Sequence, residues 1–138
     1  MATTGTILAK TFKIYTGGTP SAITCQVNAS LSASTEMFDT TCKDSTAWNE
    51  QLPGTKSWTI SGTGNLAFDA TNGWSALFTA WNNQTVVAVV FQNAVTGDKK
   101  YSGNAYISSL TLTSDGNNGP VTFDFEFTGT GALTEATI

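Results

Sequence analysis

The sequence of 138 residues is long enough for one domain with a hydrophobic core of its own. Its net charge is −4, and only 12% of its residues are charged, about half the usual share of roughly 25%. The six cations are all lysines, and none cluster beyond Lys99 and Lys100. The absence of arginine and histidine argues against proteins that grip phosphates or read bases, and against histidine-based catalysis.

The two cysteines, Cys25 and Cys42, do not have the spacing of metal ligands, and no histidine is present to complete a site. Residues 1–10 lack the apolar run of a signal peptide, and no segment approaches membrane-spanning length. We therefore expect folding in a reducing cytosol, without a metal, a cofactor or a membrane partner. Both thiols are expected to be buried and free, with a disulfide as the alternative.

The first third of the chain predicts three strands. Residues 6–15 suit an extended strand, the turn sequence TGGTP follows, and residues 22–31 form the returning strand. A serine-rich bend at residues 32–35 leads to a third, short strand at residues 36–42. A charged loop over residues 43–56 then has Pro53 and Gly54 as its turn.

The next strand alternates strictly with period two, which is typical of a half-buried antiparallel sheet. Its expected inward residues are Trp58, Ile60, Gly62, Gly64, Leu66 and Phe68. Its expected outward residues are Ser57, Thr59, Ser61, Thr63 and Asn65.

A single helical pattern follows this strand. An apolar stripe with spacing i, i+3, i+4, i+7 predicts a helix of about ten residues that lies against the sheet. The stripe consists of Trp74, Leu77, Phe78 and Trp81, with Asp69, Thr71 and Asn72 as capping candidates and Asn82 and Asn83 at the end. We interpret its aromatic side chains as core packing rather than as a ligand box.

The last part of the chain predicts three more strands, at residues 85–92, at residues 101–113 and after the loop SDGNNGP. The final strand sets Val121, Phe123, Phe125 and Phe127 inward and Thr122, Asp124, Glu126 and Thr128 outward. The predicted fold is mainly β, an antiparallel β-sandwich or partial barrel of about seven strands with one flanking α-helix. Residues 1–138 form one domain, without a repeat or a linker.

Two other functions can be weighed from the residues. Carboxylate pairs such as Asp124 and Glu126 could in principle serve a glycosidase, but two acids on one strand face beside threonines are typical of solvated surface. We therefore expect no enzymatic activity. The alternative is a carbohydrate-binding β-sandwich module that uses Trp48 and Asn49, although one aromatic on a loop is a thin platform.

The order of the motifs resembles the major tail tube proteins of phages with long, non-contractile (siphophage-type) tails. The segment EMFDTTCKDSTAWNEQLPGTKSWTISGTG contains the family's acidic strand, its loop with Trp and Leu-Pro-Gly, and its Trp-bearing strand. The segment from YSGNAYISSL to GTGALTEATI is similar to the family's closing hairpin. The resemblance spans essentially the whole chain, and the tail tube proteins of gene transfer agents are similar too.

The resemblance implies a structural virion protein. Such subunits form hexameric rings that stack into a hollow tube, in which one sheet from each subunit contributes to a β-barrel around the lumen. The implied partners are further copies of the chain, a tape-measure protein, tail terminator and initiator proteins, and DNA that passes without sequence-specific binding. The implied location is the virion tail, after assembly in the host bacterial cytoplasm.

The resemblance also implies roles for particular residues. The loop is expected to reach the neighbouring ring, unless Trp48 folds back on its own domain; its candidate contacts are Lys43, Asp44, Trp48, Glu50, Leu52 and Pro53. Two polar faces are candidates for the lumen: one with Thr59, Ser61 and Thr63, the other with Thr122, Asp124 and Glu126. Short arms at residues 1–6 and 131–138 are further expected contacts.

Overall fold

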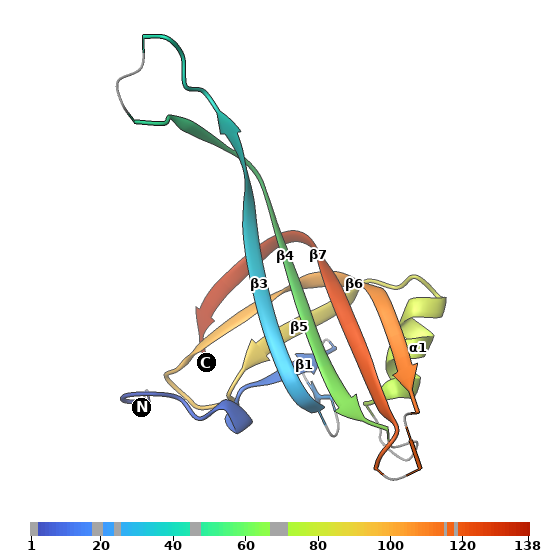
Figure 1. Cartoon of the computed structure of the whole chain (residues 1–138). Helices are drawn as coiled ribbons and strands as arrows, with labels where there is room; N and C mark the ends of the chain where they lie inside the picture. The colour runs from blue at the N-terminus through green and yellow to red at the C-terminus, as the bar shows by residue number, and fades with distance from the viewer. Residues whose placement is uncertain are drawn as a thin grey trace.

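The computed structural model describes residues 3–17, 21–23, 26–44, 48–66, 72–114, 116–117 and 119–138. It confirms a mainly β fold with seven antiparallel strands and one helix (Figure 1). The strands form one curled sheet. Of the two predicted forms, a β-sandwich or a partial barrel, the structure has the partial barrel. The elements are η1 (Ala9–Thr11), β1 (Lys13–Thr16), β2 (Ser21–Ala22), β3 (Gln26–Asp39), β4 (Gln51–Asn65), α1 (Trp74–Asn82), β5 (Val87–Gln92), β6 (Lys99–Thr113) and β7 (Thr122–Thr137).

The order of strands across the sheet is β2-β1-β5-β6-β7-β4-β3. The long strands β3, β4, β7 and β6 run side by side, and the sheet curls so that β1 comes near β3 (Figure 1). The side chain of Gln26 joins these two strands: its Oε1 accepts a hydrogen bond from the Ile14 amide, and its Nε2 donates to the Ile14 carbonyl, both at 3.0 Å. A side chain therefore takes the place of strand pairing where the curled sheet almost closes.

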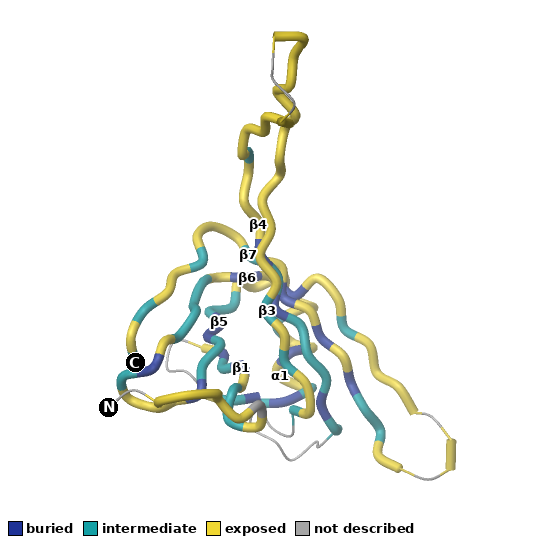
Figure 2. Tube along the Cα trace, turned by 60° about the vertical axis from the view of Figure 1, so that its left-hand side comes forward, coloured by how far each residue is buried: buried dark blue, intermediate teal, exposed yellow. Residues whose placement is uncertain are grey.

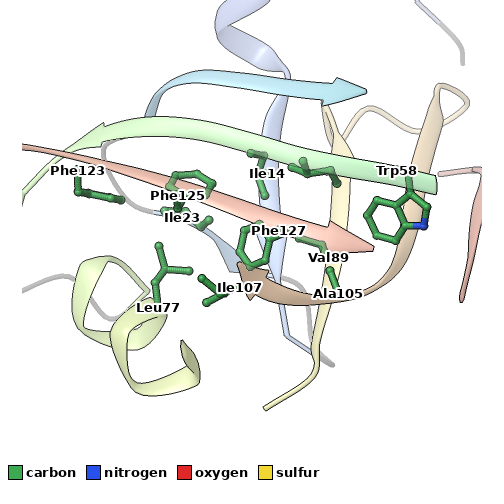
Figure 3. Close-up of a cluster of buried hydrophobic side chains, with 11 residues drawn as sticks. Ile14, Ile23, Trp58, Leu77, Val89, Ala105, Ile107, Phe123, Phe125 and Phe127 are labelled. Carbon is green, nitrogen blue, oxygen red and sulfur yellow. The ribbon is translucent and has the colours of Figure 1, made fainter. Parts of the chain in front are cut away.

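The core lies inside the curl, as the period-two pattern predicts. Phe123, Phe125 and Phe127 of β7 are buried there, beside Ile60 of β4 and Ile14 of β1 (Figure 3). Adjacent phenyl rings of β7 are 5.9 and 5.6 Å apart between centroids, within the range that favours aromatic pairs. This apolar face fixes the register of β7, because a slip of one residue would turn its acids inward.

Trp58 forms the end of the core that is distant from the helix (Figure 3). Its indole lies against Gly129 of β7, where an added Cβ would be 2.1 Å from the ring, and its Nε1 donates to the Gly131 carbonyl at 3.1 Å. Gly129 is thus required by the close approach of a large side chain to the strand backbone.

Helix α1 lies against the core near β6, but it buries less than its apolar stripe predicts (Figure 1). Leu77 is 3% exposed, whereas Phe78 and Trp81 are 46% and 44% exposed. The helix has no side-chain cap: Gly73 is its N-cap, and Asn72 instead donates to the Thr16 hydroxyl and the Ser21 carbonyl. The other capping candidates, Asp69 and Thr71, lie outside the described residues.

Three predictions for the first half are wrong. A 3₁₀ turn occupies Ala9–Thr11, so the first strand begins only at Lys13. Strand β3 is continuous through residues 32–35, because β4 pairs with it along that whole stretch. Pro53 and Gly54 lie within β4, not at a turn; Pro53 is opposite Met37, next to a register shift in β3.

The cysteines also differ from the expectation. Cys42 is exposed rather than buried, because it lies in the loop beyond the end of β3. Cys25, like the expected inward residue Phe68, falls outside the described residues. No helix in the described part of the chain is long and apolar enough to cross a membrane.

Candidate assembly surfaces

The two predicted lumen faces are one surface. In the pairing of β4 with β7, Ser61 is opposite Glu126 and Thr63 is opposite Asp124, so their side chains share the face away from the core. Thr59 is opposite Thr128 and Asn65 is opposite Thr122, which extends the same face at both ends. The structure therefore brings all six candidate residues together.

Sequence reasoning missed that this polar face continues onto β3 and β6. Ser30 and Asn28 of β3 pair with Ser61 and Thr63, and Ser109 and Thr111 of β6 pair with Glu126 and Asp124. Polar side chains of the four strands line a shallow depression of about 360 Å³. We use the name polar face for twelve polar residues that point outward in the central part of these strands; they are Asn28, Ser30, Ser32, Thr59, Ser61, Thr63, Ser109, Thr111, Thr122, Asp124, Glu126 and Thr128.

The chemistry of the polar face is that of hydroxyls, an amide and two carboxylates. Its residues include no lysine, so the face has nothing that neutralises a phosphate. Ser108, at a register shift in β6, donates to a carboxylate oxygen of Glu126 at 3.3 Å. Within the described residues, no group of three or more acids or cysteines is arranged to hold a metal ion.

The ends of β3 and β4 continue beyond the sheet as a two-stranded arm (Figure 1). We define the arm as residues 36–44 and 48–56; Figure 2 shows it to be exposed almost throughout. At the base of its loop, the Thr40 amide donates to the Glu50 carbonyl at 2.9 Å, and the Glu50 amide donates to the Thr41 hydroxyl at 2.8 Å. Hydrogen bonds from the Thr41 hydroxyl and amide hold the pKa of Asp39 below its ordinary value.

The arm exposes large apolar side chains. Trp48 is 81% exposed in the loop, so in the single chain it does not fold back on the core. Leu52 is 57% exposed on β4, and sequence reasoning missed Phe38, 49% exposed opposite Leu52, and Met37, 51% exposed opposite Pro53. The sequence signal for these two residues was the pair of adjacent apolar residues in EMFD, which would lie on opposite faces of a strand. The polar candidates Lys43, Asp44 and Glu50 are exposed on the loop, and Pro53 is exposed on β4.

The turn between β5 and β6 holds both ends of the described chain. The Asp98 carboxylate is buried and accepts hydrogen bonds from the Thr3 amide and hydroxyl, both at 2.5 Å, and from Asn93 at 2.7 Å. These hydrogen bonds, from the Thr3 hydroxyl first, hold the pKa of Asp98 below its ordinary value. The Ile138 amide donates to the Asp98 carbonyl at 2.8 Å.

The C-terminal segment, expected as a contact arm, is a strand of its own subunit. Residues 131–137 continue β7, and Glu135 pairs with Tyr101 of β6. The Tyr101 hydroxyl donates to the Glu135 carboxylate at 2.8 Å, which raises the pKa of Tyr101. The N-terminal residues from Thr3 to Leu8 are exposed, apart from the anchor at Asp98.

Comparison with known proteins identifies this architecture. The model of a family described as phage tail tube protein matches residues 9–135. No curated protein sequence matches the chain.

Chains from solved virion and tail structures have the same fold. A chain from the virion of a native gene transfer agent particle has a TM-score of 0.83 at 20% identity, over 96% of this chain and 100% of that one. A chain from the tail of an empty gene transfer agent particle, with C6 symmetry, has a TM-score of 0.84 at 21% identity and the same coverages. The SPP1 tail tube protein has a TM-score of 0.74 at 19% identity, over 96% of this chain and 80% of that one.

The family match covers nearly the whole chain and agrees with the fold. It confirms the resemblance that the sequence motifs indicated, and the prediction of a structural rather than an enzymatic role. The chain belongs to the phage tail tube protein family.

Proposed function

We propose that this tail tube subunit assembles into hexameric rings and that the rings stack into a hollow tube through which DNA passes into the host. The observation that carries the proposal is the four-stranded part of the sheet, β3-β4-β7-β6, whose polar face is continuous across all four strands. A face of this kind, joined to its copies around an axis, makes a hydrophilic channel wall. Of two solved structures with the same fold, one comes from a virion and the other from a tail with C6 symmetry.

The charge of the polar face suits a channel for DNA. Asp124 and Glu126 are both exposed on it, and the face has no lysine, so a passing duplex meets acids and hydroxyls. Protein binding to DNA depends largely on cations that neutralise phosphates and release counterions. A wall with the same negative charge as the phosphates repels the DNA backbone, and DNA can move along it without being held.

The arm provides the contact between rings. Its apolar residues lie on a projection that is far from the core of its own subunit, so they gain burial only from another molecule (Figure 2). Trp48 is the expected anchor, together with Leu52 and Pro53, since tryptophan is enriched among interface hot spots. Lys43, Asp44 and Glu50 supply the polar rim.

The other partners follow from the same role. A tape-measure protein occupies the lumen before DNA does, and terminator and initiator proteins cover the two ends of the tube. In this role the subunit resides in the virion tail and, during assembly, in the cytoplasm of the host bacterium. No part of this role requires a cofactor, a metal or a membrane.

Negative-stain electron microscopy of the purified chain, over a range of concentrations and several days, tests the proposal. We expect rings or tubes with six-fold end views. A different symmetry in the end views would refute the hexamer. Particles that stay dispersed at every concentration and bind a specific sugar on a glycan array would instead support the carbohydrate-binding alternative, with Trp48 as its aromatic platform.

A further inference from the structure

An asparagine that precedes a glycine joins the first two strands to the helix. Asn72 is followed by Gly73, which is the N-cap of α1. Its side-chain nitrogen donates to the Thr16 hydroxyl of β1 at 2.8 Å and to the Ser21 carbonyl of β2 at 2.7 Å. The amide has two hydrogens, so both are used. We call these two hydrogen bonds the Asn72 junction.

The Asn72 junction holds elements that contribute to the core on both sides. Within the described residues, β2 is at the end of the strand order and pairs with β1 alone. The residue after β2, Ile23, is buried in the core, and its amide donates to the Ile14 carbonyl at 3.1 Å. On the other side of the junction, α1 buries Leu77 in the same core. Loss of the junction therefore loosens two elements that each place a side chain in the core.

An asparagine before a glycine is also chemically labile. Glycine has no Cβ, so its backbone nitrogen can approach the preceding side chain closely. The Gly73 nitrogen attacks the side-chain carbonyl carbon of Asn72, a C–N bond forms, and the amide nitrogen leaves as ammonia together with the Gly73 proton. Water then opens the five-membered succinimide by breaking one of its two C–N bonds, and the products are aspartate and isoaspartate. Water is the only further reactant.

We propose that Asn72 is a site of spontaneous deamidation whose rate is set by the two hydrogen bonds of its junction, and that the reaction irreversibly releases β2 from the start of α1. The site and the reaction belong to the single chain, independent of any ring or tube. A subunit that waits in solution therefore loses the Asn72 junction with time, at a rate that its own fold controls.

The closed junction opposes the reaction. Two hydrogen bonds hold the Asn72 amide in place, and Gly73 is buried. Attack requires freedom of the side chain and of the Gly73 backbone, and hydrolysis requires water. The reaction therefore proceeds from a locally opened junction, and the population of that open form depends on the free energy of the two hydrogen bonds.

The product cannot restore the junction. An aspartate carboxylate only accepts hydrogen bonds, so it can accept one from the Thr16 hydroxyl but meets the Ser21 carbonyl as a second acceptor. Isoaspartate in addition lengthens the main chain by one carbon directly before α1. The helix dipole favours a negative charge at this end of α1, which offsets part of the loss. Neither product can donate to the Ser21 carbonyl, so the release is permanent.

Peptide mapping by mass spectrometry tests the proposed protection. Purified subunit is held in mildly alkaline buffer with and without urea, and the small mass gain from exchange of –NH2 for –OH is followed. We expect Asn72 to react at least about fivefold more slowly in the folded chain than in urea, because closing the junction forms two hydrogen bonds. In urea its rate should match that of Asn118, which also precedes a glycine. Equal Asn72 rates with and without urea, or no reaction of Asn72 in urea, would overturn the inference.

Thr16→Val separates the role of the hydrogen bond from that of burial, because it removes one acceptor and keeps the size of the side chain. We expect the Asn72 rate in the folded chain to rise about two- to tenfold, as for the loss of one hydrogen bond. The matched control is Thr79→Val, which removes a hydrogen bond to the Ser75 carbonyl within α1 and should leave the rate unchanged. Both rates are measured where urea unfolding shows the variant to be folded. An unchanged rate in Thr16→Val would overturn the role of the junction.

Asn72→Asp reproduces one product and tests the release of β2. Hydrogen exchange followed by NMR should be at least about twofold faster than in the parent at the Ile23 amide. It should be unchanged at the Asn83 amide, which donates to the Thr79 carbonyl at the far end of α1. Asn49→Asp, at an exposed residue of the arm, is the matched control for charge. Parent-like exchange at Ile23 in Asn72→Asp would contradict the inference.

Discussion

The two halves of the β3–β4 hairpin obtain their stability in different ways. At its base, Trp58 and Ile60 are buried against β7, and each strand has a core side. In the arm, Phe38 and Leu52 form a strand pair with solvent on both faces. The same hydrogen-bonded ladder runs through both halves, but an isolated two-stranded ribbon is marginal in water. The base is therefore stabilised by the core of the subunit, whereas the arm has no core side of its own.

The largest effect on stability is expected from Phe127→Ala. Phe127 is fully buried in the middle of the core, and truncation of such a side chain costs about 3–5 kcal/mol of unfolding free energy. Phe38→Ala in the arm is the matched control, and we expect less than about 1 kcal/mol there, because half of that side chain is already in water. Urea unfolding of both variants measures the two costs, and equal costs would contradict the contrast.

Glycine substitutions in the base and in the arm are expected to have smaller and unequal effects. A Cβ at Gly129 would lie 2.1 Å from the Trp58 ring, and a Cβ at Gly54 would lie 2.5 Å from the Phe38 ring. Trp58 is buried and hydrogen-bonded, so Gly129→Ala should cost about 1–3 kcal/mol. Phe38 can rotate into solvent, so Gly54→Ala should change the urea midpoint only slightly. A larger loss from Gly54→Ala would show that the arm is more tightly packed than the base.

The two acids with lowered pKa values provide a contrast in pH dependence. Because the pKa of Asp98 is lower in the folded state than its unfolded value of about 3.9, its contribution is complete above that pH. The contribution is lost as the pH falls through 3.9 toward the folded value. We therefore expect the stability gap between the parent and Asp98→Asn to shrink on acidification in this window.

Asp39→Asn is the control for that titration. Asp39 also has a lowered pKa, but its partner Thr41 is in the exposed arm, so global unfolding should hardly report it. Thermal unfolding from pH 7 to pH 3 follows both variants. A constant gap for Asp98→Asn would show that its hydrogen bonds to Thr3 and Asn93 do not stabilise the folded chain.

The smallest effect on stability is expected from Trp48→Ala. With its side chain 81% exposed, the substitution should shift the unfolding free energy by no more than about 0.5 kcal/mol. Tube assembly should nevertheless fail or stop at short lengths, because the arm loses its anchor. Trp48→Phe retains an aromatic side chain and should preserve longer tubes. Tubes of normal length from Trp48→Ala, measured by negative-stain microscopy, would remove the arm contact from the proposal.

Much of the base was predictable from alternation. The inward phenylalanines of β7 and the inward Trp58 and Ile60 of β4 lie on the core side, as the period of two predicts. When only one face of a strand is buried, only one orientation of the strand puts its apolar side chains in the core. Leu110 and Leu112 of β6 share the core side in the same way, although a register shift at Ser108 interrupts the alternation.

The arm and the serine-rich stretch that leads to it were not predictable in the same way. The serine-rich stretch and Pro53-Gly54 have the composition of turns, yet pairing of β3 with β4 carries both through as strand. For the helix, the sequence predicted too much burial. Its apolar stripe predicts that Phe78 and Trp81 are buried, but the spacing of residues along a helix does not reveal whether the subunit itself covers the whole stripe. That the two candidate lumen faces are one also required the β4–β7 register, which single-strand patterns do not contain.

The amide of Gln26 has a consequence for how the subunit can deform. The Gln26 side chain bonds to both backbone groups of Ile14, as a paired strand would, so side-chain hydrogen bonds rather than strand pairing join β1 to β3. Loss of these two hydrogen bonds separates no paired strands of the long hairpins. A change in the curvature of the sheet at this point therefore costs two side-chain hydrogen bonds rather than a ladder of backbone pairs.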